Sequence, residues 1–315
     1  MFALFLVFFG WFVFQIKGII VSIFLSYIIM AAVLPAVEFL QRKKFPKILA
    51  VLIPYLTIVI AIFLVVIPLV PFVIEQIQSF ITRFPELLDK TSKNFGFVIN
   101  PNQIQDFFAS QGSALSKNAL NVTGQVFGGI FSTMTIFVVS FYLLMYSDAF
   151  KRFMANLFHD GSREYIAKTL DEVNLKLGAW LRGEVTLMVF IGFFSWIGLT
   201  ILGLPYALPL ALLAGLLEAV PTLGPIISAI PAVIVAFTVS PTMALTVVAL
   251  YMLIQALENQ VLVPKVMQKA VGLNPVVVIL SIMIGANLMG VAGALLAIPF
   301  VSFIIVLINS FESRK

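Results

Sequence analysis

Long apolar runs separated by short charged segments decide what this chain can fold into. Hydrophobic residues make up 61% of its 315 residues and charged residues only 10%, whereas a soluble domain carries about 25% charged residues. Runs such as 19–40 and 122–146 are long enough to cross a bilayer as helices, which takes about 20 apolar residues. The strands of a membrane β-barrel would instead alternate in segments of about ten residues. The sequence therefore predicts an all-α, polytopic integral membrane protein.

The basic residues lie at the ends of the apolar runs, which is the pattern of the positive-inside rule rather than of a surface that binds nucleic acid. The densest basic cluster, at 41–47, is expected in the cytoplasm. If both termini, 148–183 and the loop after Glu258 share that side, 14 of the 19 Lys and Arg residues are cytoplasmic. We therefore predict a multi-pass plasma-membrane protein with cytoplasmic N- and C-termini, whose partners are bilayer lipid and not nucleic acid.

The alternation of apolar and polar runs divides the chain into five regions and predicts about eight transmembrane segments, at roughly 20 residues each. The regions are N-terminal spans at 1–74, an external amphipathic helical insert at 75–121, a span at 122–147, a cytoplasmic amphipathic helical region at 148–183 and a C-terminal transmembrane core at 184–311.

Each polar region carries its own helix signals. In the external insert, Asn100-Pro101 is typical of a helix start. In the cytoplasmic region, Glu164 and Lys168 are spaced as an i,i+4 ion pair beside an apolar stripe. Such a helix lies on the membrane surface or pairs with another subunit, and the spacing does not distinguish the two.

Glu218 is the only formally charged residue between Glu184 and Glu258. It lies in an apolar stretch, 203–238, that prolines and glycines interrupt, so the runs on either side are short for a straight transmembrane helix. Short, broken apolar segments are typical of transporter binding sites. The sequence predicts a broken or re-entrant helical hairpin with Glu218 near its tip. Either Glu218 is a structural carboxyl bonded to a neighbouring helix, or it exchanges a proton or cation during transport.

A second hairpin is predicted at 272–308. The segment Gly224-Pro-Ile-Ile-Ser-Ala-Ile-Pro231 recurs loosely as Gly293-Ala-Leu-Leu-Ala-Ile-Pro299, and Asn287 occupies the place that Glu218 has in the first copy. In the topology above the two copies enter from opposite sides, as inverted repeats of secondary transporters do. Chance similarity between Gly-rich apolar helices explains the match equally well.

Three more groups of residues are candidates for the site. Gln255, Glu258 and Asn259 share one helical face and could line a cytoplasmic gate, although helix ends at the headgroups are normally polar. Asn287 could hydrogen-bond a solute or only the backbone. Arg182 and Glu184 are expected to be interfacial anchors. The backbone hinges of the two hairpins are predicted at Pro221, Gly224, Pro225, Pro231, Gly293 and Pro299.

Several chemistries are excluded by what the sequence lacks. It has no cysteine, no phosphate-binding G-x-x-x-x-G-K-[ST] loop and no H-E-x-x-H zinc motif. The single histidine, His159, is expected in a solvated loop and is a poor metal site alone. We therefore expect no enzyme activity, no metal and no cofactor, apart from H⁺ or Na⁺ as a coupling ion.

The C-terminal third resembles a known family. Pro221-Thr-Leu-Gly-Pro225 through Ala229-Ile-Pro231-Ala232, Gln255-Ala-Leu-Glu258-Asn-Gln and Pro264-Lys-Val-Met267 are similar to the autoinducer-2 exporter family of permeases. The order of elements matches over nearly the whole chain. In the family pattern the acidic or polar residue often stands one position later than Glu218, where this chain has Ala219. The family role therefore does not transfer directly to Glu218.

The resemblance implies a prokaryotic plasma-membrane transporter and a homo-oligomer. We expect a secondary transporter that exports a small polar solute, such as the signal autoinducer-2, coupled to a proton or sodium gradient. The alternatives are a Na⁺(Li⁺)/H⁺ antiporter without an organic substrate, and an oligomeric channel or scaffold.

Overall fold

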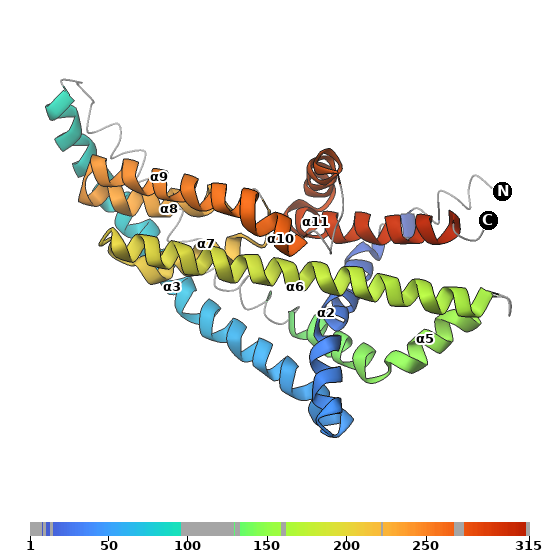
Figure 1. Cartoon of the computed structure of the whole chain (residues 1–315). Coiled ribbons are helices and arrows are strands. Elements are labelled where there is room, and N and C mark those ends of the chain that lie inside the picture. The colour runs from blue at the N-terminus through green and yellow to red at the C-terminus, as the bar shows by residue number, and fades with distance from the viewer. Residues whose placement is uncertain are drawn as a thin grey trace. The chain divides into compact units, whose positions relative to one another are not determined.

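Helices make up the regular structure of the described part of the chain in its computed structural model (Figure 1). The structure describes residues 8, 11–12, 15–95, 129, 133–158, 162–221, 223–267 and 274–312. Within them, five helices are long and apolar enough to cross a membrane, and a bent pair of helices provides a sixth span if it is counted as one. This confirms an all-α, polytopic membrane protein.

The number of spans is lower than eight for two reasons. Most of the apolar run 2–16, which is the first of the N-terminal spans expected within 1–74, lies outside the described residues. The 203–238 stretch forms two helices of 11 and 17 residues, each too short to count as a span. The order of helices is α2 (Lys17–Arg42), α3 (Lys47–Phe95), an unlabelled helix Thr133–Met145, α5 (Ser147–Asn156), α6 (Arg163–Ile201), α7 (Ala207–Leu217), α8 (Leu223–Val239), α9 (Pro241–Leu257), α10 (Val263–Met267) and α11 (Pro275–Glu312).

The chain divides into two compact units. The first unit comprises Met1–Val59, Phe131–Gly183 and Met267–Lys315, and the second comprises Ile60–Ile130 and Glu184–Val266. The core of the first unit includes Met30 and Val33 of α2, Val51 of α3 and Leu144 of the helix Thr133–Met145. Between the last two helices, the buried hydroxyls of Tyr55 and Ser140 hydrogen-bond each other.

Proline breaks the hydrogen-bond ladder of α2, and α6 supplies the missing donor. Pro35 has no N–H, so the carbonyl of Ala31 has no partner within its own helix. The Arg182 guanidinium donates to the carbonyl oxygens of Ala31 and Ala32 at 3.3 and 3.2 Å. Gly178 makes this approach possible, since a Cβ there would lie 2.3 Å from the Ala31 oxygen. Arg182, expected at the membrane interface, therefore holds two helices together.

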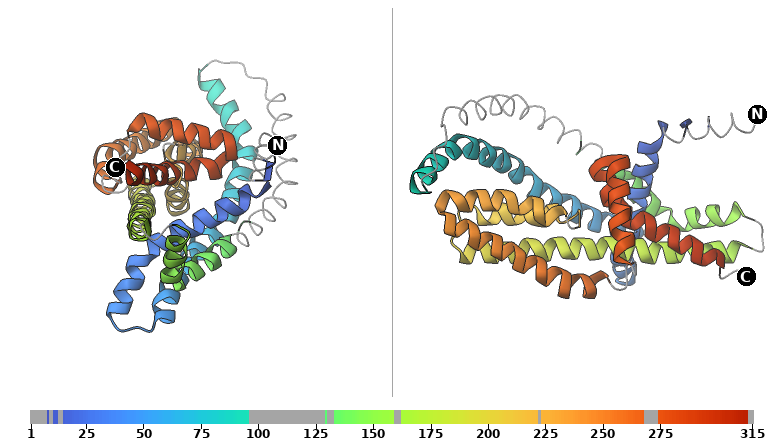
Figure 2. Two further views of the ribbon diagram at one scale, coloured as in Figure 1. Left: turned by 90° about the vertical axis from the view of Figure 1, so that its right-hand side faces the viewer. Right: turned by 90° about the horizontal axis from the view of Figure 1, so that it is seen from above.

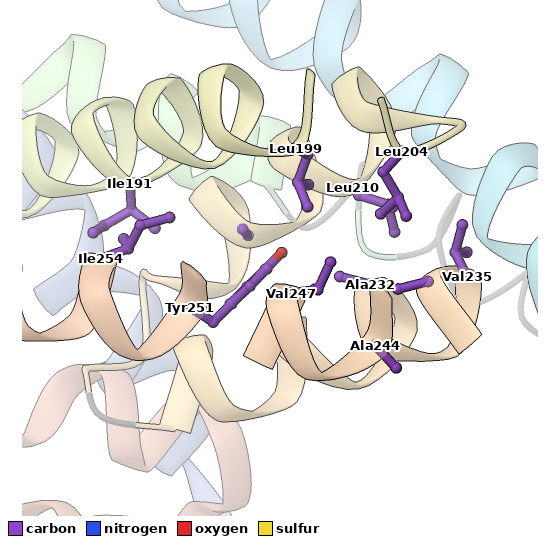
Figure 3. Packing of buried hydrophobic residues seen from close by; sticks show 12 residues of the cluster. Ile191, Leu199, Leu204, Leu210, Ala232, Val235, Ala244, Val247, Tyr251 and Ile254 are labelled. Carbon is purple, nitrogen blue, oxygen red and sulfur yellow. The ribbon is translucent and has the colours of Figure 1, made fainter. Parts of the chain in front are cut away.

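The second unit is organised around α7, α8, α9 and the part of α6 that follows Gly183. Its core contains Ile191 and Leu199 of α6, Leu210 of α7, and Val247 and Tyr251 of α9 (Figure 3). Figure 2 shows α8 and α9 side by side, joined by a short turn. Ser240 caps α9 by accepting a hydrogen bond from the Met243 amide, and Pro241 follows it at the first helical position.

Two helices are longer than the sequence predicts. The polar 148–183 region and the span after it are expected as separate parts, but α6 runs through both as one helix of 39 residues. Near its start, Glu164 and Lys168 form the expected ion pair at 2.9 Å. Similarly, α3 continues past its prolines to Phe95 instead of ending near residue 74. The external placement of 75–121 stays a prediction, and Asn100-Pro101 and His159 lie outside the described residues.

α11 consists of two helical arms that meet at a sharp break (Figure 2). Met289 and Gly290 have non-helical backbone angles, and Gly290 has φ 62° and ψ −142°, a region open mainly to glycine. The two arms approach each other closely at Gly285 and Gly293. A Cβ on Gly293 would lie only 1.9 Å from the Gly285 carbonyl oxygen, so the approach depends on glycine at this position. The break falls inside the range 272–308 predicted for the second hairpin.

Candidate functional site

Glu218 stands at the end of α7, where the chain turns into α8. It is the residue that caps α7, and its backbone N–H donates to the Ala214 carbonyl oxygen. The turn is tight: Gly224, the second residue of α8, lies so close that a Cβ would be 2.1 Å from the Leu217 carbonyl oxygen and 2.8 Å from the Glu218 Cα. The two helices therefore hold the Glu218 backbone between them.

Glu258 comes from another helix of the same unit. It begins a π-helical turn, Glu258–Leu262, directly after α9. Such wide turns inside helices occur often at functional sites. The Gln255 side chain, one turn earlier, donates a hydrogen bond to the Glu258 carboxylate at 3.0 Å.

Glu184 completes a cluster of three acidic side chains. It lies one turn before Met188 on α6, and Met188 is the residue whose carbonyl oxygen would be 2.7 Å from a Cβ on Gly215 of α7. Because α6 and α7 touch at this point, Glu218 at the end of α7 lies near Glu184 on α6. The carboxyl groups of Glu184, Glu218 and Glu258 are close enough to act electrostatically on one another.

The three carboxyl groups are buried, with Glu184, Glu218 and Glu258 only 2%, 1% and 3% exposed. No protein N–H or O–H donor among the described residues satisfies the oxygens of Glu184 or Glu218. Carboxylates gathered away from water cannot all stay ionised without a compensating cation. The charge of Glu184, Glu218 and Glu258, named from here on the carboxyl cluster, is therefore set by protons or by a bound cation.

No metal centre is apparent in the part of the chain that the structure describes. There, no group of three or more His, Cys, Asp or Glu side chains is arranged to hold a metal ion.

The structure brings together some of the predicted site residues and separates others. Glu218, Glu258 and Gln255 meet in the second unit, while Asn259 next to them is exposed. Asn287 is exposed on α11 in the first unit. The pairing of the two hairpins as inverted repeats stays a prediction.

The predicted hinge residues lie at the turns and inside the helices of the two hairpins. Pro221 is in the turn after Glu218, Pro225 is in the first turn of α8 and Pro231 is inside α8. Gly293 and Pro299 are both buried in α11. Proline in a first helical turn costs no hydrogen bond, whereas Pro231 and Pro299 each remove one.

Sequence reasoning undervalued Glu184. It follows Arg182 at the start of an apolar run, which is the ordinary position of an interfacial anchor. The signal that could have identified it is the spacing of Glu184, Met188, Ile191 and Ser195, since all four fall on one helical face that the structure buries in part or in full.

Comparison with known proteins gives a consistent result. Residues 2–313 match the AI-2E family transporter. A Bacillus subtilis (strain 168) protein named "Putative transport protein YueF" is 25% identical over 312 residues, covering 91% of this chain and 84% of that protein. "Putative permease PerM" of Escherichia coli (strain K12) is 39% identical over 146 residues, which is 46% of this chain and 41% of that protein.

The family match covers almost the whole chain, and the helices that it spans are those that cross the membrane and carry the carboxyl cluster. It identifies a transporter rather than an enzyme. The chain belongs to the AI-2E family of membrane transporters.

Proposed function

We propose that this protein is a secondary transporter that exports a small polar solute across the plasma membrane and couples the export to proton movement. The observation that carries the proposal is the gathering of three buried carboxyl groups, those of Glu184, Glu218 and Glu258, which act electrostatically on one another. Two buried carboxyl groups can share a proton in one state and release it in another. The relatives, which are named as transport proteins and a permease, support the transport role.

Glu218 is the group that binds and releases the coupling proton in this scheme. It lies at the junction of two short helices, α7 and α8, and a movement of either helix changes its distance from Glu258. Pairing with Glu258 favours the protonated form, and separation of the two groups, or their exposure to water, favours proton release. The proposal also includes the direction of transport, from the cytoplasm outward, and the small polar nature of the solute. It places both termini in the cytoplasm.

The test measures proton movement in proteoliposomes that enclose a pH-sensitive dye, across a panel of solutes and cations. Glu218→Gln keeps the size and the polarity of the side chain but cannot release a proton. We expect this variant to fold normally and to lose solute-dependent proton movement. Glu258→Gln should lose it as well, while Glu164→Gln, a change at an exposed glutamate, should behave as wild type.

Two outcomes contradict the proposal. Wild-type proton movement by Glu218→Gln removes the coupling role. Sodium-driven proton movement that needs no added solute replaces the solute exporter with a Na⁺/H⁺ antiporter, in which the carboxyl cluster alternates between a proton and a sodium ion.

A further inference from the structure

Two buried hydroxyl groups in the second unit have no hydrogen-bond partner among the described residues. They are Ser195 Oγ of α6 and Tyr251 Oη of α9. Ser195 is fully buried and Tyr251 is 8% exposed. A buried hydroxyl without a partner costs roughly 1–3 kcal/mol, so such groups call for an explanation.

The two hydroxyls belong to helix faces that pack against each other. Ser195 stands one turn from Ile191 and one turn from Leu199, and both of these residues lie in the same apolar cluster as Tyr251. Figure 3 shows the Tyr251 side chain extending from α9 across that cluster, with its hydroxyl oxygen directed toward Leu199. Gly198 of α6 lies directly against Leu250 of α9, since a Cβ on Gly198 would be 2.6 Å from the Leu250 Cδ1. This stretch of α6 therefore faces this stretch of α9.

Polar groups continue from Tyr251 to the carboxyl cluster along one side of α9. Gln255 follows Tyr251 by one turn, and Glu258 follows Gln255 by one turn and accepts its hydrogen bond at 3.0 Å. With a helical rise of about 1.5 Å per residue, Tyr251 and Glu258 stand about 10 Å apart along the axis. That distance exceeds a direct hydrogen bond but is short enough for a few water molecules to bridge.

We propose that Ser195 and Tyr251 hold buried water that continues past Gln255 to the carboxyl cluster and forms a proton path. This inference rests on the proposed function, because it assigns the route by which protons reach Glu258 and Glu218. Water is the ligand that the chemistry favours: the hydroxyls are surrounded by apolar side chains, so a larger polar solute would leave its own groups unpaired. A water molecule needs only two to four polar partners.

The proton transfer along such a path is balanced at each group. The Tyr251 hydroxyl oxygen accepts a proton from a hydronium ion on one side as its own proton leaves to a water molecule on the other, and the hydroxyl is regenerated. Ser195 acts in the same way or only holds the water in place. The proton reaches a carboxylate of the cluster, and neither an oxidant nor a reductant is needed.

The first test detects the water without measuring transport. Radiolytic hydroxyl-radical labelling modifies side chains that contact bound water, even when they are buried. We expect modification of Tyr251 in the intact protein, at a dose that modifies the exposed Tyr206. Tyr55 is the matched control, because it is also buried, at 5% exposure, but its hydroxyl is bonded to Ser140. Equal, background modification of Tyr251 and Tyr55 would overturn the proposal.

The second test uses variants that remove only the hydroxyls. Tyr251→Phe and Ser195→Ala delete no protein hydrogen bond seen in the described residues, so their melting temperatures should stay close to that of wild type. Proton movement in proteoliposomes should fall by roughly tenfold or more, since positioned proton-transfer groups contribute on the order of 10²–10⁴-fold in rate. Tyr55→Phe should show the opposite pattern, with a lower melting temperature and unchanged proton movement.

These measurements separate the path from the function that it serves. Wild-type proton movement in both Tyr251→Phe and Ser195→Ala overturns the path, whatever Glu218→Gln does. Wild-type proton movement in Glu218→Gln overturns the proposed function, even if Tyr251 is labelled. A weakened affinity for solute with unchanged proton movement in Tyr251→Phe would also overturn the path and assign the hydroxyl to the solute.

Discussion

The α7–α8 hairpin and the two arms of α11 solve the same packing problem with different contents. In each, one glycine lets a backbone approach that a Cβ would block, Gly224 against Leu217 and Gly293 against Gly285. The first hairpin encloses a carboxyl group that is almost fully buried, Glu218, whereas the second leaves Asn287 exposed. Similar backbone constraints therefore support a candidate site in one hairpin and not in the other.

The difference lies in what surrounds each tip. Glu218 is met by acidic side chains from α6 and from the end of α9, so the end of its helix faces other polar groups. The break in α11 at Met289 and Gly290 depends on a backbone conformation and the glycine contact that follows it. A hairpin in this protein becomes a site through its neighbours and not through its own turn.

The largest expected effects come from closing the two glycine contacts. Gly224→Ala and Gly293→Ala would each place a Cβ within about 2 Å of a carbonyl oxygen, at 2.1 and 1.9 Å. Overpacking of this kind destabilises by about 1–3 kcal/mol, and contacts with backbone fall at the upper end. Both variants should melt at lower temperature in detergent.

A transport measurement distinguishes the Gly224→Ala variant from the Gly293→Ala variant. Gly224→Ala should also abolish proton coupling because it moves the backbone of Glu218, while the Gly293→Ala protein that remains folded should keep its pH response. If both variants lose the pH response equally at matched folded fractions, the two hairpins do not differ as we describe.

A smaller effect is expected at the break in α11, where backbone strain acts without a clash. Gly290 has positive φ and no atom within 4 Å of the Cβ position. Gly290→Ala should therefore cost only the strain of an unfavourable conformation, at the lower end of about 1–3 kcal/mol. Thermal unfolding of Gly290→Ala checks this, with Gly203→Ala measured alongside it, because Gly203 also has positive φ and open space. A Gly290→Ala protein as stable as wild type would show that the break is not fixed by its backbone angles.

The smallest effect is expected at Asn287. Because this side chain is exposed, Asn287→Ala should change stability by no more than about 0.5 kcal/mol. It should also leave solute-dependent proton movement close to wild type, in contrast to Glu218→Gln. A loss of transport as complete as that of Glu218→Gln would restore Asn287 as the counterpart of Glu218 and would erase the functional difference between the hairpins.

Much of the architecture could be predicted from the sequence, because membrane helices follow directly from apolar length. The all-α polytopic fold and the Glu164–Lys168 pair are confirmed. The isolation of Glu218 in an apolar stretch singled it out, since a charge at that position is costly without a purpose.

The remainder depended on which helix faces meet. Sequence spacing placed Glu258 on a face with Gln255 and Asn259 but could not tell that Glu258 lies beside Glu218 while Asn259 is exposed. Glu184 resembled an interfacial anchor because its neighbour is Arg182. The lengths of α3 and α6 were also underestimated: prolines and polar residues weaken a helix in isolation, but packing against neighbouring helices can override such local preferences.

The contact of Arg182 with α2 has a consequence for movement. The carbonyl oxygens of Ala31 and Ala32 accept hydrogen bonds from Arg182 of α6. If α2 slid along α6, the Ala31 carbonyl would lose this partner, and Pro35 has no N–H to replace it. We therefore expect α2 and α6 to move together at this crossing, so that a rearrangement during transport would occur elsewhere.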